Sequence, residues 1–266
     1  MPQANMRSFR DILVYLSAGD NARARLDAAI ALAREHGARL TGVDVSHPAV
    51  FDTDRAPTAA ALEETFAEEI RLAGIEGDFH AARNAAVEGW RVMYAHYADL
   101  VVAPSASEAD AKLVMPTVPE SVLIHGGVPV LVIPDLWQKQ PIGRRVVVSW
   151  NASREATHAV HDALPLLVRA ESVTIFAFDT RQRVLKEESD HLVRHLAAHG
   201  IVARKFTWPD TGEIDPTDAL FSCLSEEGAD LIVAGGYGHP RLMERLLGGV
   251  SRTLMRTLTV PVVMSH

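Results

Sequence analysis

Short runs of apolar residues alternate along the chain with longer stretches in which apolar residues recur every three or four positions. The run Leu231-Ile232-Val233-Ala234 is apolar throughout, which is typical of a strand buried on both faces of a parallel sheet. The longer stretches have the period of an amphipathic helix. Their apolar stripes include Leu26, Ala29, Ile30 and Ala33 early in the chain and Ala156, Val160, Ala163, Leu164 and Leu167 later. This alternation predicts an α/β architecture with helices on both faces of a parallel sheet.

The same pattern predicts five strands in each half of the chain. In the first half we expect them at residues 11–16, 39–45, 76–81, 100–103 and 130–133. In the second half we expect them at residues 144–150, 173–178, 202–208, 230–235 and 261–264. Sheets of this kind bind ligands at the carboxyl ends of their strands, where the strand order reverses. The first and fourth strands of each half are therefore expected to flank such a crevice.

The two halves are copies of one another. Ala98-Asp99-Leu100-Val101-Val102-Ala103 returns 131 residues later as Ala229-Asp230-Leu231-Ile232-Val233-Ala234. Val128-Pro129-Val130 returns 132 residues later as Val260-Pro261-Val262. The repeat predicts two successive domains of the same fold.

Proline and glycine mark the boundary between the copies. Pro134, Pro141 and Gly143 surround a short segment without a helix or strand pattern, which is typical of a linker. We therefore predict a first domain at residues 1–134, a linker at 135–143 and a second domain at 144–266.

Composition excludes several classes of protein. The 266 residues are 48% hydrophobic and 23% charged, close to the average of globular proteins, and the net charge of −8 argues against a general nucleic-acid binder. No apolar run reaches the length of a membrane span, and the first ten residues lack the apolar region of a secretion signal. The single cysteine, Cys223, suits a reducing compartment and is expected to be a small buried residue. We expect a cytoplasmic protein with neither a membrane nor a nucleic-acid partner.

Glycines gather where the fourth strand of the second half ends. Gly235-Gly236-Tyr237-Gly238 follows the apolar run, and Gly248-Gly249-Val250-Ser251 precedes the predicted start of a helix. Glycine lets the backbone approach a ligand closely, and a helix N-terminus offers free N–H groups and a positive dipole end. This combination predicts a phosphate site.

On these residues both halves resemble universal stress protein domains, and the chain resembles a tandem universal stress protein. Nucleotide-binding members of that family carry the motif G-x2-G-x9-G followed by Ser or Thr, and Gly235, Gly238 and Gly248 fall at its spacing. The Ser/Thr position holds Gly249, and the acidic position after the first strand holds Asn151. The resemblance implies two flavodoxin-like, HUP-type domains with ATP or a related adenine nucleotide as ligand, accompanied by Mg²⁺.

We expect the nucleotide in the second half only. Backbone N–H groups of Gly236, Gly238, Gly249 and Val250 are predicted to face the phosphates, and the Ser251 hydroxyl is predicted to bind them too. Asn151 is expected to face the sugar or the base, more weakly than a carboxylate would. His239 is either a phosphate contact or a loop residue that helps to start the next helix. The full predicted site is Asn151, Gly235, Gly236, Gly238, His239, Gly248, Gly249, Val250 and Ser251.

The first half departs further from the motif. Its counterpart of the glycine loop, residues 104–110, contains no glycine, and Glu108 and Asp110 would repel a phosphate. Ser17 stands in the position of Asn151, and Thr117 stands in that of Gly249. We interpret this half as a degenerate copy that does not hold a nucleotide in the usual way.

Three other groups of residues have two interpretations each. His191, His195 and His199 lie at helical spacing, either as one metal-binding face or as a solvated face. Trp150 either stacks on an adenine or packs against the following helix. Three arginines near the glycines either neutralise phosphate or are solvated, namely Arg241, Arg245 and Arg252.

The function follows one of two main alternatives. The first is a nucleotide-binding stress-response or regulatory module, and the second is an interaction or scaffold protein of the same fold that binds no nucleotide. A nucleotidyl transferase or ATP pyrophosphatase ranks last, because neither His-x-Gly-His nor Ser-Gly-Gly-x-Asp-Ser occurs. We expect no catalytic residues and at most a slow ATPase. The resemblance also implies that the last strands pair, either within the chain as a pseudo-dimer of the halves or between chains as a homodimer.

Overall fold

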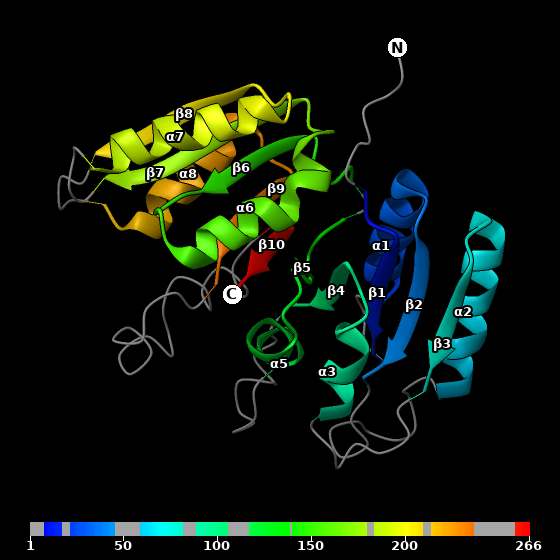
Figure 1. The fold of residues 1–266 in the computed structure, drawn as a ribbon. Coiled ribbons are helices and arrows are strands. Elements are labelled where there is room, and N and C mark those ends of the chain that lie inside the picture. Colours follow the sequence, from blue (N-terminus) through cyan, green and yellow to red (C-terminus); the bar gives the residue numbers. More distant parts are fainter. Residues whose placement is uncertain are drawn as a thin grey trace. The chain divides into compact units, whose positions relative to one another are not determined.

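In the computed structural model the chain forms two compact units, Ser8–Lys139 and Gln140–His266 (Figure 1). The boundary between the units falls inside the predicted linker. The structure describes residues 8–17, 22–45, 59–81, 89–105, 117–138, 140–179, 184–209, 214–236 and 259–266.

The N-terminal unit is a parallel five-stranded sheet in the order β3-β2-β1-β4-β5. Helices α1 and α2 contact one another, as do α3 and α5. The elements are β1 (Asp11–Leu16), α1 (Ala22–His36), β2 (Arg39–Asp44), α2 (Ala59–Ala73), β3 (Gly77–His80), α3 (Gly89–Ala95), β4 (Leu100–Pro104), α5 (Val118–His125) and β5 (Val130–Ile133).

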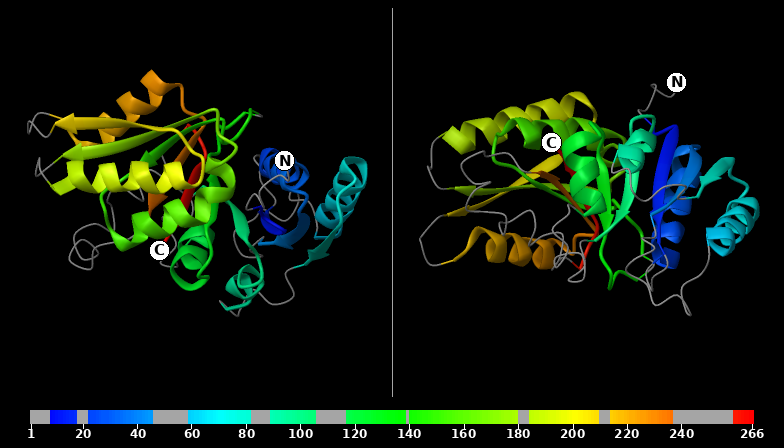
Figure 2. Two further views of the ribbon diagram at one scale, coloured as in Figure 1. Left: turned by 45° about the horizontal axis from the view of Figure 1, so that its top comes forward. Right: turned by 90° about the horizontal axis from the view of Figure 1, so that it is seen from below.

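The C-terminal unit repeats this arrangement in the order β10-β9-β6-β7-β8, again with parallel pairing. Figure 2 shows α6 and α7 on one face of this sheet and α8 on the other. The elements are β6 (Arg145–Ser149), α6 (Arg154–Leu167), β7 (Ser172–Asp179), α7 (Val184–Ala198), β8 (Ala203–Pro209), α8 (Pro216–Glu227), β9 (Leu231–Gly235) and β10 (Val262–Ser265).

The fold class is therefore confirmed: each unit is a parallel sheet covered by helices. Each strand was predicted to within one residue at both ends. Most residues of the predicted apolar stripes are buried, including Ala156, Val160 and Ala163 of α6. Ile30 of α1 is the exception, because it is only half-buried. Cys223 is buried in α8, as expected. Among the residues that the structure describes, none of the helices combines the length and the apolar character needed to span a bilayer.

The repeated Ala-Asp dipeptide has a structural reason. In the N-terminal unit, the Asp99 carboxylate accepts hydrogen bonds from the backbone N–H groups of Arg10 (2.7 Å) and Asp11 (3.0 Å). In the C-terminal unit, Asp230 Oδ1 accepts from the N–H groups of Gly143 (2.9 Å) and Arg145 (3.0 Å). Each carboxylate thus joins the start of the fourth strand to the start of the first strand, its neighbour in the sheet.

Candidate nucleotide site

The site is set by the point at which the strand order of the C-terminal unit reverses. From β6 the chain proceeds to β7 and β8 on one side, and it then returns to β9 and β10 on the other. Ser149 of β6 pairs with Ala234 of β9, so the residues that follow these two strands emerge side by side at the carboxyl edge of the sheet. This is where an open α/β sheet binds ligands.

A tight turn carries the chain from β6 into α6. Asn151 is exposed, and its Oδ1 accepts a hydrogen bond from the N–H of Ser153 at 3.1 Å. Ser153 then caps α6 by accepting from the N–H of Ala156 at 3.1 Å. Ala152 between them has a φ of 56°, a left-handed conformation that is uncommon for a residue with a Cβ. Because the Asn151 oxygen is used in the turn, the amide N–H groups are what this side chain offers a ligand.

Gly235 ends β9 directly beneath the first turn of α6. A Cβ added there would lie 2.4 Å from the backbone nitrogen of Ala156 and 2.7 Å from the carbonyl carbon of Glu155. The missing side chain therefore lets the N-terminus of α6 rest on the edge of the sheet. The first glycine of the motif has a packing role here, and its predicted contact with a nucleotide stays a prediction.

One detail of the predicted site is wrong. The N–H of Gly236 was expected to face the phosphates, but it donates to the carbonyl oxygen of Ser265 at 2.8 Å. The Gly236 carbonyl oxygen in turn lies 3.0 Å from Nδ1 of His266. Backbone pairing between β9 and β10 continues one residue further than the sequence pattern suggested, and this consumes the N–H group.

Two buried polar atoms near these strand ends have no hydrogen-bond partner in the part of the chain that the structure describes. They are Nε1 of Trp150, the residue that follows β6, and Oγ of Ser265 at the end of β10. Trp150 is 8% exposed, so it packs into the protein and does not present a ring face for stacking. Sequence reasoning missed Ser265, because the predicted last strand stopped one residue before it.

The rest of the predicted loop lies outside the described residues. This holds for Gly238, His239, Gly248, Gly249, Val250 and Ser251, and for Arg241, Arg245 and Arg252. Their roles stay predictions. The structure places Asn151, Gly235 and Gly236 at the carboxyl ends of the neighbouring strands β6 and β9.

The corresponding positions of the N-terminal unit are used differently. Ser17, the counterpart of Asn151, accepts a hydrogen bond from Nη2 of Arg25 at 3.1 Å. Thr117, the counterpart of Gly249, forms a capping box with Glu120 at the start of α5. Glu120 accepts from the Thr117 N–H at 2.9 Å, and Thr117 Oγ1 accepts from the Glu120 N–H at 3.4 Å. Glu108 and Asp110 lie outside the described residues.

The histidines of α7 do not converge on one point. His191 Nδ1 lies 2.9 Å from an Arg194 nitrogen, whereas the His195 ring contacts the ring of His199 with centroids 4.9 Å apart. His195 also stacks on His161 of α6 at 5.0 Å. Within the described residues, no group of three His, Cys, Asp or Glu side chains is arranged to hold a metal ion.

Comparison with known proteins agrees with this fold. Residues 209–266 match the model of the universal stress protein family. A universal stress protein from Archaeoglobus fulgidus superposes on 94% of the chain and 97% of its own length, with a TM-score of 0.68 and 17% identity. The chain has the fold of a tandem universal stress protein. A putative universal stress protein from Pseudomonas aeruginosa gives a TM-score of 0.63 at 16% identity, over 98% of this chain and 94% of that one.

Shorter universal stress protein structures match half of the chain. One of them, a complex with cAMP, covers 48% of this chain and 99% of its own, with 20% identity and a TM-score of 0.37. No curated protein sequence matches the chain.

Proposed function

We propose that this protein is a universal stress protein-type regulatory module that binds ATP or a related adenine nucleotide in its C-terminal unit. The observation that carries the proposal is the placement of Asn151 beside Gly235 and Gly236 at the reversal of strand order between β6 and β9. An exposed hydrogen-bonding side chain thus stands next to a glycine-lined strand end at the edge where such sheets bind ligands.

The described residues supply two kinds of interaction. The amide N–H groups of Asn151 donate to a ribose oxygen or to a ring nitrogen of the base. Because Gly235 has no Cβ, the first turn of α6 lies close to the edge of the sheet. The positive end of the α6 dipole would there attract the negative charge of the nucleotide phosphates. The predicted loop adds backbone N–H groups of Gly238, Gly249 and Val250, and Mg²⁺ accompanies the phosphates when nucleotide is bound.

The same chemistry supports binding without fast turnover. A cradle of N–H groups stabilises bound nucleotide and transition state alike, and uniform binding gives little rate acceleration. The sequence has no Walker lysine, and the nearest candidates for a general base are His239 and Glu244. ATP hydrolysis should therefore be far slower than the typical enzymatic rate of roughly 10 per second. Phosphate release at saturating ATP and Mg²⁺ measures it, and a rate near that value that His239→Ala abolishes would make the protein an enzyme.

The deciding experiment asks what the purified protein carries. Small molecules released by denaturation are identified by absorbance and mass, and ATP binding to nucleotide-free protein is measured by calorimetry. Asn151→Ala should weaken ATP binding about tenfold, since a lost hydrogen bond costs about 1–1.5 kcal/mol. Ser17→Ala, the matched change in the other unit, should leave it unaltered.

Two outcomes would contradict this proposal. If no nucleotide is released and none binds, the protein is an interaction or scaffold protein of the same fold. If ATP binds equally well to the parent and to Asn151→Ala, a nucleotide is bound but the crevice between β6 and β9 is the wrong place for it. The cytoplasmic location and the pairing of last strands stay predictions.

A further inference from the structure

A buried arginine stands in the N-terminal unit where the C-terminal unit has an alanine. Arg25 lies in the first turn of α1 and is 3% exposed. The apolar stripes of α1 and α6 align Arg25 with Ala159, which is fully buried. Arginine is rarely buried without an anionic partner, because removing a charge from water is costly.

The contacts of Arg25 in the described residues are with neutral oxygens. Its Nε donates to the carbonyl oxygen of Tyr15 at 3.1 Å, and its Nη2 donates to Oγ of Ser17 at 3.1 Å. Within the described ranges it forms no ion pair, and the carboxylate that acts on it from a distance is the exposed Asp135. Burial lowers the pKa of Arg25 to about 10, so the group remains a cation at neutral pH.

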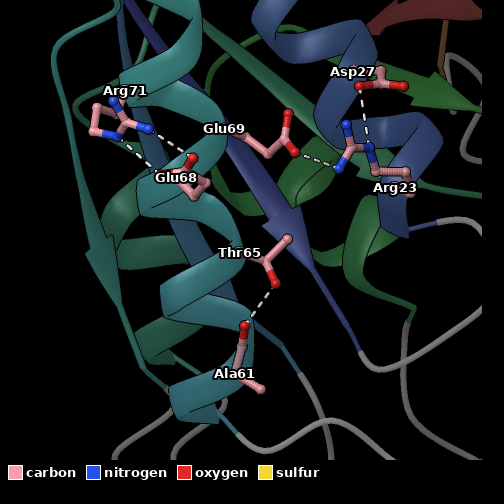
Figure 3. A network of polar contacts seen from close by, with 7 residues as sticks. All are labelled: Arg23, Asp27, Ala61, Thr65, Glu68, Glu69 and Arg71. Atoms are coloured by element: carbon pink, nitrogen blue, oxygen red, sulfur yellow. Dashed lines mark hydrogen bonds and ion pairs between the residues drawn. The ribbon is translucent and has the colours of Figure 1, made fainter.

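Another arginine on the same helix shows the contrast. Arg23, two residues earlier, is exposed, and it forms ion pairs with Asp27 at 3.4 Å and with Glu69 of α2 at 2.5 Å (Figure 3). The solvated Arg23 is thus paired with two carboxylates. The buried Arg25, for which an ion pair matters more, forms none among the described residues, and only the more distant Asp135 acts on it.

Arg25 reaches the edge of the sheet at which parallel α/β sheets bind ligands. Ser17 follows β1 directly, and β1 lies between β2 and β4, where the strand order of this unit reverses. The guanidinium therefore stands at the carboxyl edge of the sheet, at the reversal point. A guanidinium has five N–H donors in a planar fork that fits the oxygens of a phosphate.

We propose that the N-terminal unit binds a phosphate group at Arg25 and Ser17, through a side-chain cation in place of a glycine loop. Arg25 would donate the guanidinium hydrogens that Tyr15 and Ser17 do not accept to two phosphate oxygens, and the Ser17 hydroxyl, which accepts from Arg25, would donate to a third. The phosphate is either free inorganic phosphate or the terminal group of a phosphate monoester. The two units would then hold anions by different means, one by backbone N–H groups and one by a guanidinium.

Calorimetry on the full chain tests this proposal with inorganic phosphate and with AMP as probes. Arg25→Met removes the charge with little change of volume, and Arg23→Met is the matched control on the same helix. Phosphate should bind Arg25→Met at least tenfold more weakly than it binds Arg23→Met and the parent. If AMP binding shows the same dependence on Arg25 with higher affinity than inorganic phosphate, the natural ligand is a phosphate monoester; if it is weaker, the ligand is the free ion.

Two results would overturn the proposal. One is a parent protein that binds neither probe at millimolar concentration, and the other is equal phosphate binding by Arg25→Met and Arg23→Met. If circular dichroism shows that Arg25→Met does not fold, Arg25→Lys replaces it: it keeps the charge but loses the fork, and unchanged phosphate affinity would then refute the geometry. Asn151→Ala should retain the Arg25-dependent phosphate site, so this proposal and the nucleotide proposal can fail separately.

Discussion

Substitution of Gly235 by alanine tests the contact between β9 and α6 on which the candidate site depends. The added Cβ would lie 2.4 Å from the Ala156 nitrogen, whereas real Cβ atoms do not come closer than 3.0 Å. The obstructing atoms belong to the backbone, so no side-chain rotation relieves the overlap and the first turn of α6 must move outward. Overpacking of this kind costs about 1–3 kcal/mol. Since 1 kcal/mol lowers the melting temperature of a domain of about 100 residues by about 4–8 °C, a loss of at least about 4 °C is expected.

The assay is urea and thermal denaturation of the full chain, followed by circular dichroism. Trimming the neighbouring side chain, as in the double variant Gly235→Ala with Ala156→Gly, should not restore stability, because the overlap involves main-chain atoms. Displacing α6 also moves Asn151, so ATP affinity should fall together with stability. A Gly235→Ala variant as stable as the parent, with unchanged ATP affinity, would show that α6 does not rest on Gly235 and would remove the basis of the site.

Four further outcomes follow from the sequence and the structure. Gly238→Val should abolish ATP binding in calorimetry while the circular dichroism spectrum is retained, and a variant that binds as tightly as the parent would contradict the predicted loop. Burial, helped by the nearby Glu227, raises the pKa of Cys223 to about 12. The thiol should therefore resist a disulfide reagent in native protein at pH 8 and react after denaturation. Rapid labelling of the native protein would contradict the burial of Cys223. Asp230→Ala should cost about 1–3 kcal/mol in urea denaturation, because one buried and one partly buried N–H group lose their acceptor. Burial raises the pKa of the folded Asp230 carboxyl above its ordinary value of 3.8, despite its backbone hydrogen bonds. Protonation of Asp230 therefore stabilises the folded state fully below pH 3.8, and this stabilisation is lost as the pH rises through the pKa of the folded state. Asp230→Asn should remove this pH dependence of the unfolding free energy.

Periodicity predicted the strands and helices well, because it reports which residues avoid water and at what spacing. It failed where a polar residue is buried. Arg25 was not among the residues of the predicted apolar stripe, although it is buried like its neighbours Leu26 and Ala29. Its burial depends on acceptors at the end of β1, and the helical pattern carries no information about those acceptors.

The candidate site shows the same limit of sequence-based prediction at the level of single atoms. The motif spacing located Gly235 and Gly236 beside Asn151, but it could not say which of their groups are already used by the protein. The Gly236 N–H is consumed by Ser265, a residue 29 positions away whose register follows from sheet pairing. The packing role of Gly235 depends on how closely α6 approaches the sheet, which is a three-dimensional quantity.

The carboxylates of Asp99 and Asp230 also bear on how the chain is made. Each carboxylate accepts hydrogen bonds from backbone N–H groups that precede it by more than 80 residues. Asp11 lies 88 positions before Asp99, and Gly143 lies 87 positions before Asp230. The central strand β1 therefore waits during synthesis until β4 has left the ribosome, since β4 is its second neighbour in the sheet. All partners of that strand are nevertheless complete before the C-terminal unit begins. The N-terminal unit can thus close its own sheet while the second copy of the pattern is still being translated, which limits mispairing between two similar sets of strands.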